Sequence, residues 1–119
     1  MAGGTDFLRS DPEYDMGITG AIKISHLAES FGVDVEIHVC GPAHRHVMAA
    51  TRNTNYYEVA LVGPDCPNTM APVYTCGYSD MIDCINEDGF VPVPDGIRLG
   101  VKYDWDFIKV NTTNISVYE

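Results

Sequence analysis

Hydrophobic and polar residues recur with two different periods along the first half of the chain. Residues 6–10 form a short extended run before a turn, which predicts a strand. Residues 17–32 carry apolar side chains three or four positions apart, which is the period of a helix, with Thr19 as the expected N-cap and Gly32 as the stop. Residues 33–39 then alternate between apolar and polar side chains, as a half-buried strand does.

A second helix and a third strand continue this pattern. Pro42 suits the first position of a helix, so we expect a helix through residues 43–52. The expected apolar face of this helix is lined by Ala43, Val47 and Ala50. Residues 56–62 have the composition of a strand. Because short connections join alternating strands and helices, the order β-α-β-α-β predicts an α/β fold with parallel strands wrapped by helices.

Beyond Gly63 the periodicity ends, and prolines and glycines mark a long irregular segment. In this segment we expect a short extended run at residues 89–94, a short helix at 104–110, and a terminal strand or arm at 115–118. A loop-rich segment of this length in a compact protein is usually functional or packed against another part.

The charge of the chain narrows the possible partners. Its 119 residues carry 17 acidic and 7 basic side chains, a net charge of −10, which disfavours binding to nucleic acid or to an anionic membrane surface. No apolar run approaches the roughly 18 residues that a membrane-spanning helix needs. The first residues lack the basic and apolar regions of a signal peptide, so we expect a cytoplasmic protein.

The cysteines do not form a disulfide or C-x-x-C pattern. There are four in 119 residues, which is too sparse for a disulfide scaffold, and we expect free thiols. A bridge from Cys76 to Cys66 or to Cys84 would form only in an oxidising compartment.

Three side chains that can take part in acid–base chemistry lie at or near successive predicted strand ends. They are Asp11, His38 and Glu58. In parallel α/β barrels the carboxyl ends of the strands form the rim of the active site. A histidine can remove a proton near neutral pH, a neighbouring carboxylate can fix its tautomer, and a protonated acid can donate to a developing oxyanion. The competing interpretation makes Asp11 a turn residue, His38 a core histidine and Glu58 a surface acid.

A different interpretation places zinc at the sequence His38-x-Cys40-x-x-x-His44-x-His46. One cysteine and three histidines within nine residues match the ligand types of a tetrahedral zinc site. However, His44 and His46 are two positions apart on the predicted helix and therefore point in different directions. The alternative to zinc is a loop cysteine with two solvated helix histidines.

Several motifs resemble one enzyme family. Residues 11–20 place an aspartate ahead of a Gly-Ile-Thr-Gly helix opening, and residues 27–32 end that helix as Leu-Ala-Glu-Ser-Phe-Gly. Intervals of 27 and 20 residues separate Asp11, His38 and Glu58, and residues 91–96 read Val-Pro-Val-Pro-Asp-Gly. The set resembles strands six to eight and the closing segment of mandelate racemase-like enzymes of the enolase superfamily, of the acid-sugar dehydratase type.

The resemblance implies a fold. Residues 1–63 would be part of a TIM-type βα barrel, with strands six to eight, and residues 64–119 would be a loop-rich closing segment, short helix and C-terminal arm of the same domain. A complete barrel of this kind has about 250 residues.

The resemblance also implies a reaction. Enzymes of this family bind a carboxylate substrate on Mg²⁺ and remove the proton α to the carboxylate. His38 would be the base, Asp11 its orienting partner and Glu58 a hydrogen-bond donor to the enediolate. The substrate would be an acid sugar that undergoes dehydration, and racemisation or epimerisation is the alternative within the superfamily.

The same resemblance shows what this chain does not supply. The Lys-x-Lys pair and the acidic metal ligands of the family lie on earlier strands, so we expect this chain to bind no Mg²⁺ and to have no turnover by itself. A part-barrel exposes strand edges that recruit other chains. Homo-oligomerisation, or complementation by an N-terminal half, is therefore the expected partnership, and a non-catalytic self-associating module is the alternative outside enzymology.

Overall fold

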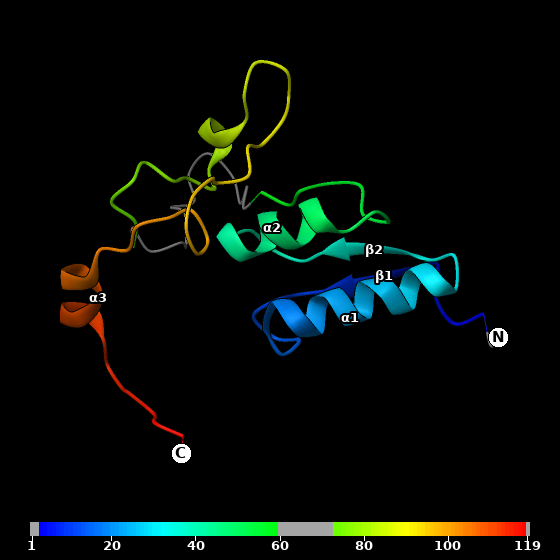
Figure 1. Cartoon of the computed structure of the whole chain (residues 1–119), viewed down its shortest axis with the longest axis horizontal. Helices are drawn as coiled ribbons and strands as arrows, with labels where there is room; N and C mark the ends of the chain where they lie inside the picture. Colours follow the sequence, from blue (N-terminus) through cyan, green and yellow to red (C-terminus); the bar gives the residue numbers. More distant parts are fainter. Residues whose placement is uncertain (1–2, 60–72, 119) are drawn as a thin grey trace, which may run out of the picture.

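The computed structural model describes residues 3–59 and 73–118 of the chain. The elements follow one another as shown in Figure 1: β1 (Phe7–Ser10), α1 (Gly17–Ser30), β2 (Asp34–Ile37), α2 (Pro42–Ala50), a single 3₁₀ turn (Ile82–Cys84) and α3 (Trp105–Asn111).

The two strands lie side by side and parallel, joined by the crossover helix α1. Phe7 pairs with Asp34 at one end of the ladder, and Ser10 pairs with Ile37 at the other. The ladder ends with the His38 N–H donating to the Ser10 carbonyl at 2.8 Å. Both strands therefore end at the same edge, so that the residues after them lie next to each other. The predicted β-α-β-α order and the parallel pairing are confirmed.

Helix α1 ends where the sequence predicts but begins earlier. Gly32 has φ 67°, and the N–H of Val33 returns to the Ala28 carbonyl at 3.0 Å, which closes the helix. The N-cap is Met16, with φ 61°, and not Thr19, which lies within the first turn. The Thr19 prediction is wrong because the chain enters the helix through a left-handed residue, without a side-chain cap.

The core is small and lies where α1 and α2 meet β2. Ala21, Ile37 and Val47 are nearly inaccessible, and Ile22 and Met48 pack against them. The predicted apolar face of α2 is only partly correct, because Val47 is buried whereas Ala50 is exposed. Its buried face instead includes the polar side chains of His44 and Arg45.

The third strand expected at residues 56–62 does not form in its described part. Residues 56–59 have no ladder, and residues 60–62 lie outside the described residues. The outer edge of β2 is contacted by Asn53, whose carbonyl accepts from Val35 N–H at 2.8 Å. Beyond that point the carboxylate of Glu36 accepts a hydrogen bond of 3.5 Å from the backbone N–H of Tyr56. One backbone hydrogen bond and one side-chain contact thus stand where a parallel strand would make a ladder.

The second half of the described chain has little regular structure. The extended run expected at 89–94 forms no strand, whereas the helix expected at 104–110 is confirmed as α3. Asp104 caps α3 by accepting from Phe107 N–H at 2.9 Å. Residues 112–118 are an exposed arm. In the described part of the chain, no helix is long and apolar enough to cross a membrane.

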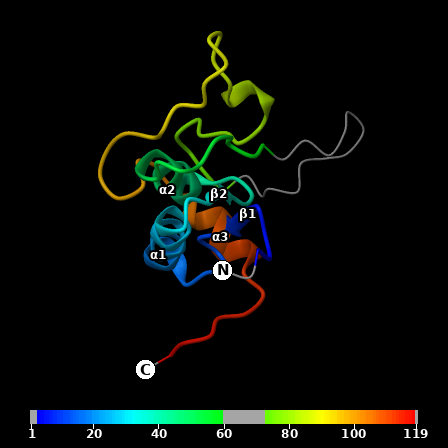
Figure 2. The same cartoon turned by 90° about the vertical axis from the view of Figure 1, so that its right-hand side faces the viewer.

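The molecule is open rather than spherical. Figures 1 and 2 show α1 and α2 against the two strands, with the loops after residue 73 extending away from them and α3 standing apart. The radius of gyration is 16.1 Å, compared with about 13.5 Å for a compact domain of this length. Many large apolar side chains are exposed, including Phe7, Leu27 and Phe31.

Candidate active site

The ends of β1 and β2 bring His38 and Asp11 together. The imidazole Nδ1 of His38 lies 2.9 Å from Oδ2 of Asp11. The Asp11 side chain is 7% exposed and that of His38 is 41% exposed, so the ring reaches from a buried carboxylate to the surface. An ionised carboxylate only accepts hydrogen bonds, so Nδ1 carries the proton and Nε2 is the basic nitrogen. The two side chains therefore lie at one edge of the parallel strands, as the sequence predicts.

The turn after β1 fixes the Asp11 carboxylate. The backbone N–H of Glu13 donates to Asp11 Oδ1 at 2.8 Å, and that of Asp11 itself donates to Asp15 Oδ2 at 2.8 Å. Burial alone would raise the pKa of Asp11, but the hydrogen bonds from Glu13, His38 and His44 lower it below its ordinary value. Asp11 is thus held ionised beside the imidazole.

A second histidine binds the same carboxylate. His44 Nε2 lies 3.2 Å from Asp11 Oδ1, and its side chain is 2% exposed. The interpretation of His44 and His46 as solvated helix residues is wrong, because His46 is half-buried and its Nε2 lies 3.2 Å from the Leu99 carbonyl. The partner of His44 lies 33 residues earlier in the chain, and no local pattern reveals such a contact.

Glu58 reaches the same edge of the strands but in ionised form. Its Oε2 lies 2.6 Å from the Arg9 guanidinium and accepts the Val39 N–H at 2.8 Å. The N–H of Val39 and the charge of Arg9 lower the pKa of Glu58, although partial burial opposes them. The carboxylate therefore accepts hydrogen bonds here, whereas the expected role as a donor needs a protonated acid.

A buried arginine that no sequence pattern indicated connects α2 to the loops. Arg45 makes an ion pair of 2.7 Å with Asp80 and donates to the Tyr57 hydroxyl at 3.1 Å and the Pro92 carbonyl at 3.0 Å. The Tyr57 hydroxyl donates to Asp80 at 2.5 Å and accepts the Gly41 N–H at 3.0 Å. Burial and the contact with Asp80 raise the pKa of Tyr57 to about 12. This cluster holds the loop that follows His38.

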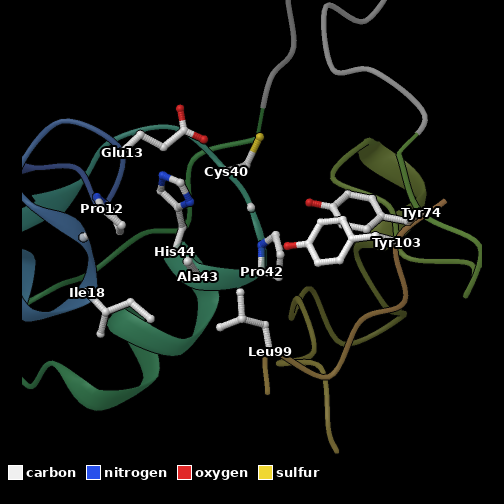
Figure 3. Close-up of a pocket in the computed structure, with 12 residues that line it drawn as sticks. Pro12, Glu13, Ile18, Cys40, Pro42, Ala43, His44, Tyr74, Leu99 and Tyr103 are labelled. Carbon is white, nitrogen blue, oxygen red and sulfur yellow. The ribbon is translucent and has the colours of Figure 1, made fainter. Parts of the chain in front are cut away.

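Two hollows flank the Asp11 turn. One, of about 300 Å³, is lined by Arg9, Ser10, Asp11, Tyr14, Asp15 and His38. The other, of about 220 Å³, lies between the same turn, the start of α2 and the loops of the second half. Figure 3 shows His44 in it beside Glu13 and Cys40, with Tyr74 and Tyr103 on the opposite wall. His38 faces the first hollow and His44 the second.

The described residues do not offer a metal site. No group of three or more His, Cys, Asp or Glu side chains within residues 3–59 and 73–118 is placed to hold an ion. This argues against the zinc site of His38, Cys40, His44 and His46. Magnesium prefers several oxygen ligands, but Asp11 is bound by histidines and Glu58 by Arg9. The residues of this edge therefore do not fit Mg²⁺.

Two of the described cysteines lie in the second half of the chain and are not joined to each other. Cys76 is exposed, Cys84 is half-buried, and neither is in a disulfide. The bridge between them that an oxidising compartment would allow is thus not formed, and Cys66 lies outside the described residues.

Comparisons of this chain with known proteins agree on its family. A family model described as enolase C-terminal domain-like matches residues 1–107. The crystal structure of D-glucarate dehydratase from Agrobacterium tumefaciens complexed with magnesium is 37% identical, with a TM-score of 0.74 over 92% of this chain. The chain spans 28% of the length of that protein. No curated protein matches it.

Proposed function

Because the chain belongs to the family of enolase C-terminal domain-like proteins, we propose that it is the base-carrying part of an acid-sugar dehydratase. The observation that supports this best is the pair of His38 and Asp11, 2.9 Å apart at the ends of adjacent parallel strands. The likeness to D-glucarate dehydratase, at 37% identity, favours dehydration over racemisation or epimerisation. The proposed substrate is a sugar acid whose carboxylate activates the neighbouring C–H bond.

The proposed chemistry uses the two nitrogens of His38 separately. Nε2 takes the proton from the carbon α to the substrate carboxylate, and the electron pair of that C–H bond moves toward the carboxylate. Nδ1–H remains on Asp11, whose negative charge stabilises the imidazolium that forms. That electron pair then returns to form the Cα=Cβ double bond as the Cβ–O bond breaks. The departing hydroxyl takes the proton back from Nε2 and leaves as water, so His38 ends in its starting state.

For Glu58 we propose a supporting role instead of the expected donation to the substrate. Its carboxylate links Arg9 on β1 to the Val39 N–H just after β2. In doing so it ties the Arg9 side chain on the neighbouring strand to the backbone that directly follows His38, and it adds a negative charge near the ring. The lowered pKa of Glu58 supports this role, because an ionised carboxylate cannot donate a hydrogen bond.

We propose that the rest of the active site comes from protein outside this chain. The homologous dehydratase was crystallised with magnesium, and this chain covers 28% of it. The described residues do not fit Mg²⁺, so the isolated chain is expected to have no turnover. When bound, the metal would stabilise the negative charge that proton removal leaves on the substrate.

The surface of the chain supports the need for a partner. Phe7, Leu27 and Phe31 are more than half exposed. An apolar hollow of about 350 Å³ opens beside them, lined by Leu8, Ala28 and Val33 among others. In the described sheet, β1 pairs only with β2. A complementary half of the barrel, or a second copy of this chain, would cover these groups. Sedimentation at low concentration tests this, and a well-folded monomer would contradict the need for a partner.

A chimera tests the proposed function. In the chimera, this chain takes the place of the matching segment of D-glucarate dehydratase. Its dehydration of D-glucarate is then measured in the presence of Mg²⁺. We expect turnover by the chimera and none by the isolated chain. His38→Asn should lower kcat at least about 100-fold, which is the usual contribution of a general base.

The control is His26→Asn, on the exposed face of α1, which should leave kcat unchanged. A folded chimera that binds Mg²⁺ but does not dehydrate D-glucarate would count against the assignment. Full activity of the His38→Asn chimera would show that another group is the base.

A further inference from the structure

The Asp11 carboxylate is shared between two imidazoles in a way that dictates where each carries its proton. Oδ2 faces His38 Nδ1 at 2.9 Å, and Oδ1 faces His44 Nε2 at 3.2 Å. The pKa of Asp11 is lowered, so the group is an ionised acceptor. A bare ring nitrogen at either position would place two acceptors against each other. His38 is therefore protonated at Nδ1 and His44 at Nε2, which are opposite tautomers.

The surroundings of His44 favour a proton on Nε2 over a proton on Nδ1. Its Nδ1 is buried and has no hydrogen-bond partner within the described residues. Gly41 packs against that nitrogen so closely that a Cβ at position 41 would lie 2.8 Å from it. A proton on Nδ1 would thus gain no acceptor, whereas a proton on Nε2 gains Asp11. This arrangement lowers the stability of the fold somewhat, because a buried nitrogen without a hydrogen-bond partner is unfavourable.

We propose that His44 is a positioning residue for the base. It donates to Asp11 from helix α2, completes the set of donors that fixes the carboxylate, and thereby keeps His38 in the tautomer whose Nε2 is basic. The catalytic part of this role rests on the proposed function. The hydrogen bonds themselves do not, because they are present in the chain without substrate. It assigns a role to a residue that neither carries nor receives the substrate proton.

Tautomers are measured directly by two-bond ¹H–¹⁵N correlation NMR of the labelled full chain at mildly alkaline pH. The hollow that His38 faces also contains the charged or titratable residues Arg9, Asp11, Tyr14 and Asp15. Glu58 lies close by at the Val39 N–H, and His44 lies on the other side of Asp11. In the wild type we expect the Nδ1–H form for His38 and the Nε2–H form for His44. Assignment of the Nδ1–H form to His44 would overturn the proposal without any variant.

Two substitutions separate positioning from packing. His44→Phe keeps an aromatic ring but removes the donor to Oδ1, so that the Asp11 carboxylate is held less firmly opposite Nδ1 of His38. His38 should then become a mixture of tautomers. His44→Gln keeps an N–H near the position of Nε2, so His38 should remain in the Nδ1–H form. The control His26→Phe, on an exposed position of α1, should change nothing at His38.

The outcomes are distinct from those of the dehydration assay. A folded His44→Phe chain whose His38 is still entirely Nδ1–H would overturn the proposal. If His44→Phe does not fold, the wild-type tautomers and the His44→Gln spectrum decide. In an active chimera, His44→Phe should lower kcat with KM retained, and His44→Gln should restore it; an inactive chimera would leave the NMR result standing.

Discussion

The Arg45 guanidinium and the Asp80 carboxylate form an ion pair of 2.7 Å in which the side chains are only 5% and 3% exposed. Tyr57 and Tyr78 both donate their hydroxyl protons to the same carboxylate oxygen, and both rings lie against the guanidinium. This pair joins α2 to the loops of the second half. Removal of one partner leaves the other charge buried without compensation.

We therefore predict that Arg45→Ala lowers the free energy of unfolding by about 3–5 kcal/mol. The matched control is Arg52→Ala, which removes an arginine that is 84% exposed and paired with Glu29. That variant should change stability by no more than about 1 kcal/mol. Urea denaturation followed by circular dichroism gives both values, and equal effects would show that the Arg45 cluster does not hold the loops.

The lowered pKa of Asp11 predicts a loss of stability in acid. Its ordinary value is 3.8, and the folded value is lower because the hydrogen bonds to the carboxylate outweigh the effect of burial. A group whose pKa is depressed by folding stabilises the fold above its unfolded pKa and loses that contribution as the pH falls through the folded pKa.

The free energy of unfolding should thus decrease as the pH is lowered from about 5 to 3. Asp11→Asn should flatten this dependence, and Glu58→Gln should do so too, because the Glu58 pKa is also lowered. Denaturation at a series of pH values measures the slope. A wild-type slope in Asp11→Asn would mean that the carboxylate is not held by His38 and His44.

The start of α1 depends on the absence of a side chain at Gly20. A Cβ at that position would lie 1.5 Å from the Asp15 carbonyl oxygen, and Asp15 holds the turn that carries Asp11. Gly20→Ala should therefore lower stability by about 1–3 kcal/mol through overpacking. Gly4→Ala, where a Cβ meets nothing within 4 Å, is the control. Equal stability of the two variants in a thermal melt would contradict the close approach.

The two described thiols of the second half should differ in reactivity. Cys76 is exposed and its pKa is lowered, chiefly by the backbone N–H of Lys102, whereas burial raises the pKa of Cys84. Because the thiolate is the reactive form, iodoacetamide at neutral pH should modify Cys76 several-fold faster. Peptide mass spectrometry resolves the sites, with Cys76→Ser as the control, and faster labelling of Cys84 would refute the prediction.

The sequence predicts the part of the fold that local periodicity determines. The two strands, α1 and α2 all have the expected type because their apolar residues recur at strand or helix spacing. The Asp11–His38 contact also follows, since residues after neighbouring parallel strands must lie at one edge. The resemblance to a known family then adds the expectation that His38 removes a proton from the substrate.

Contacts between distant polar side chains could not be predicted in the same way. His44 lies on a helix face that would suit solvent, and only a carboxylate 33 residues away makes burial possible. Arg45 is buried for the same reason, with Asp80 as its partner. The strand expected at residues 56–62 does not form over 56–59, where the side chains of Glu36 and Glu58 accept the backbone N–H groups of Tyr56 and Val39. The spacing of apolar residues along the chain does not reveal such hydrogen bonds between side chains and backbone.

The rate of α-proton loss from D-glucarate in heavy water, followed by ¹H NMR with the chimera and Mg²⁺, tests the central claim most directly, because it reports proton removal before water leaves. We expect the wild-type chimera to remove the proton and His38→Asn to be at least about 100-fold slower, with binding of D-glucarate retained. Proton loss at the wild-type rate in His38→Asn would contradict the assignment of this imidazole as the base.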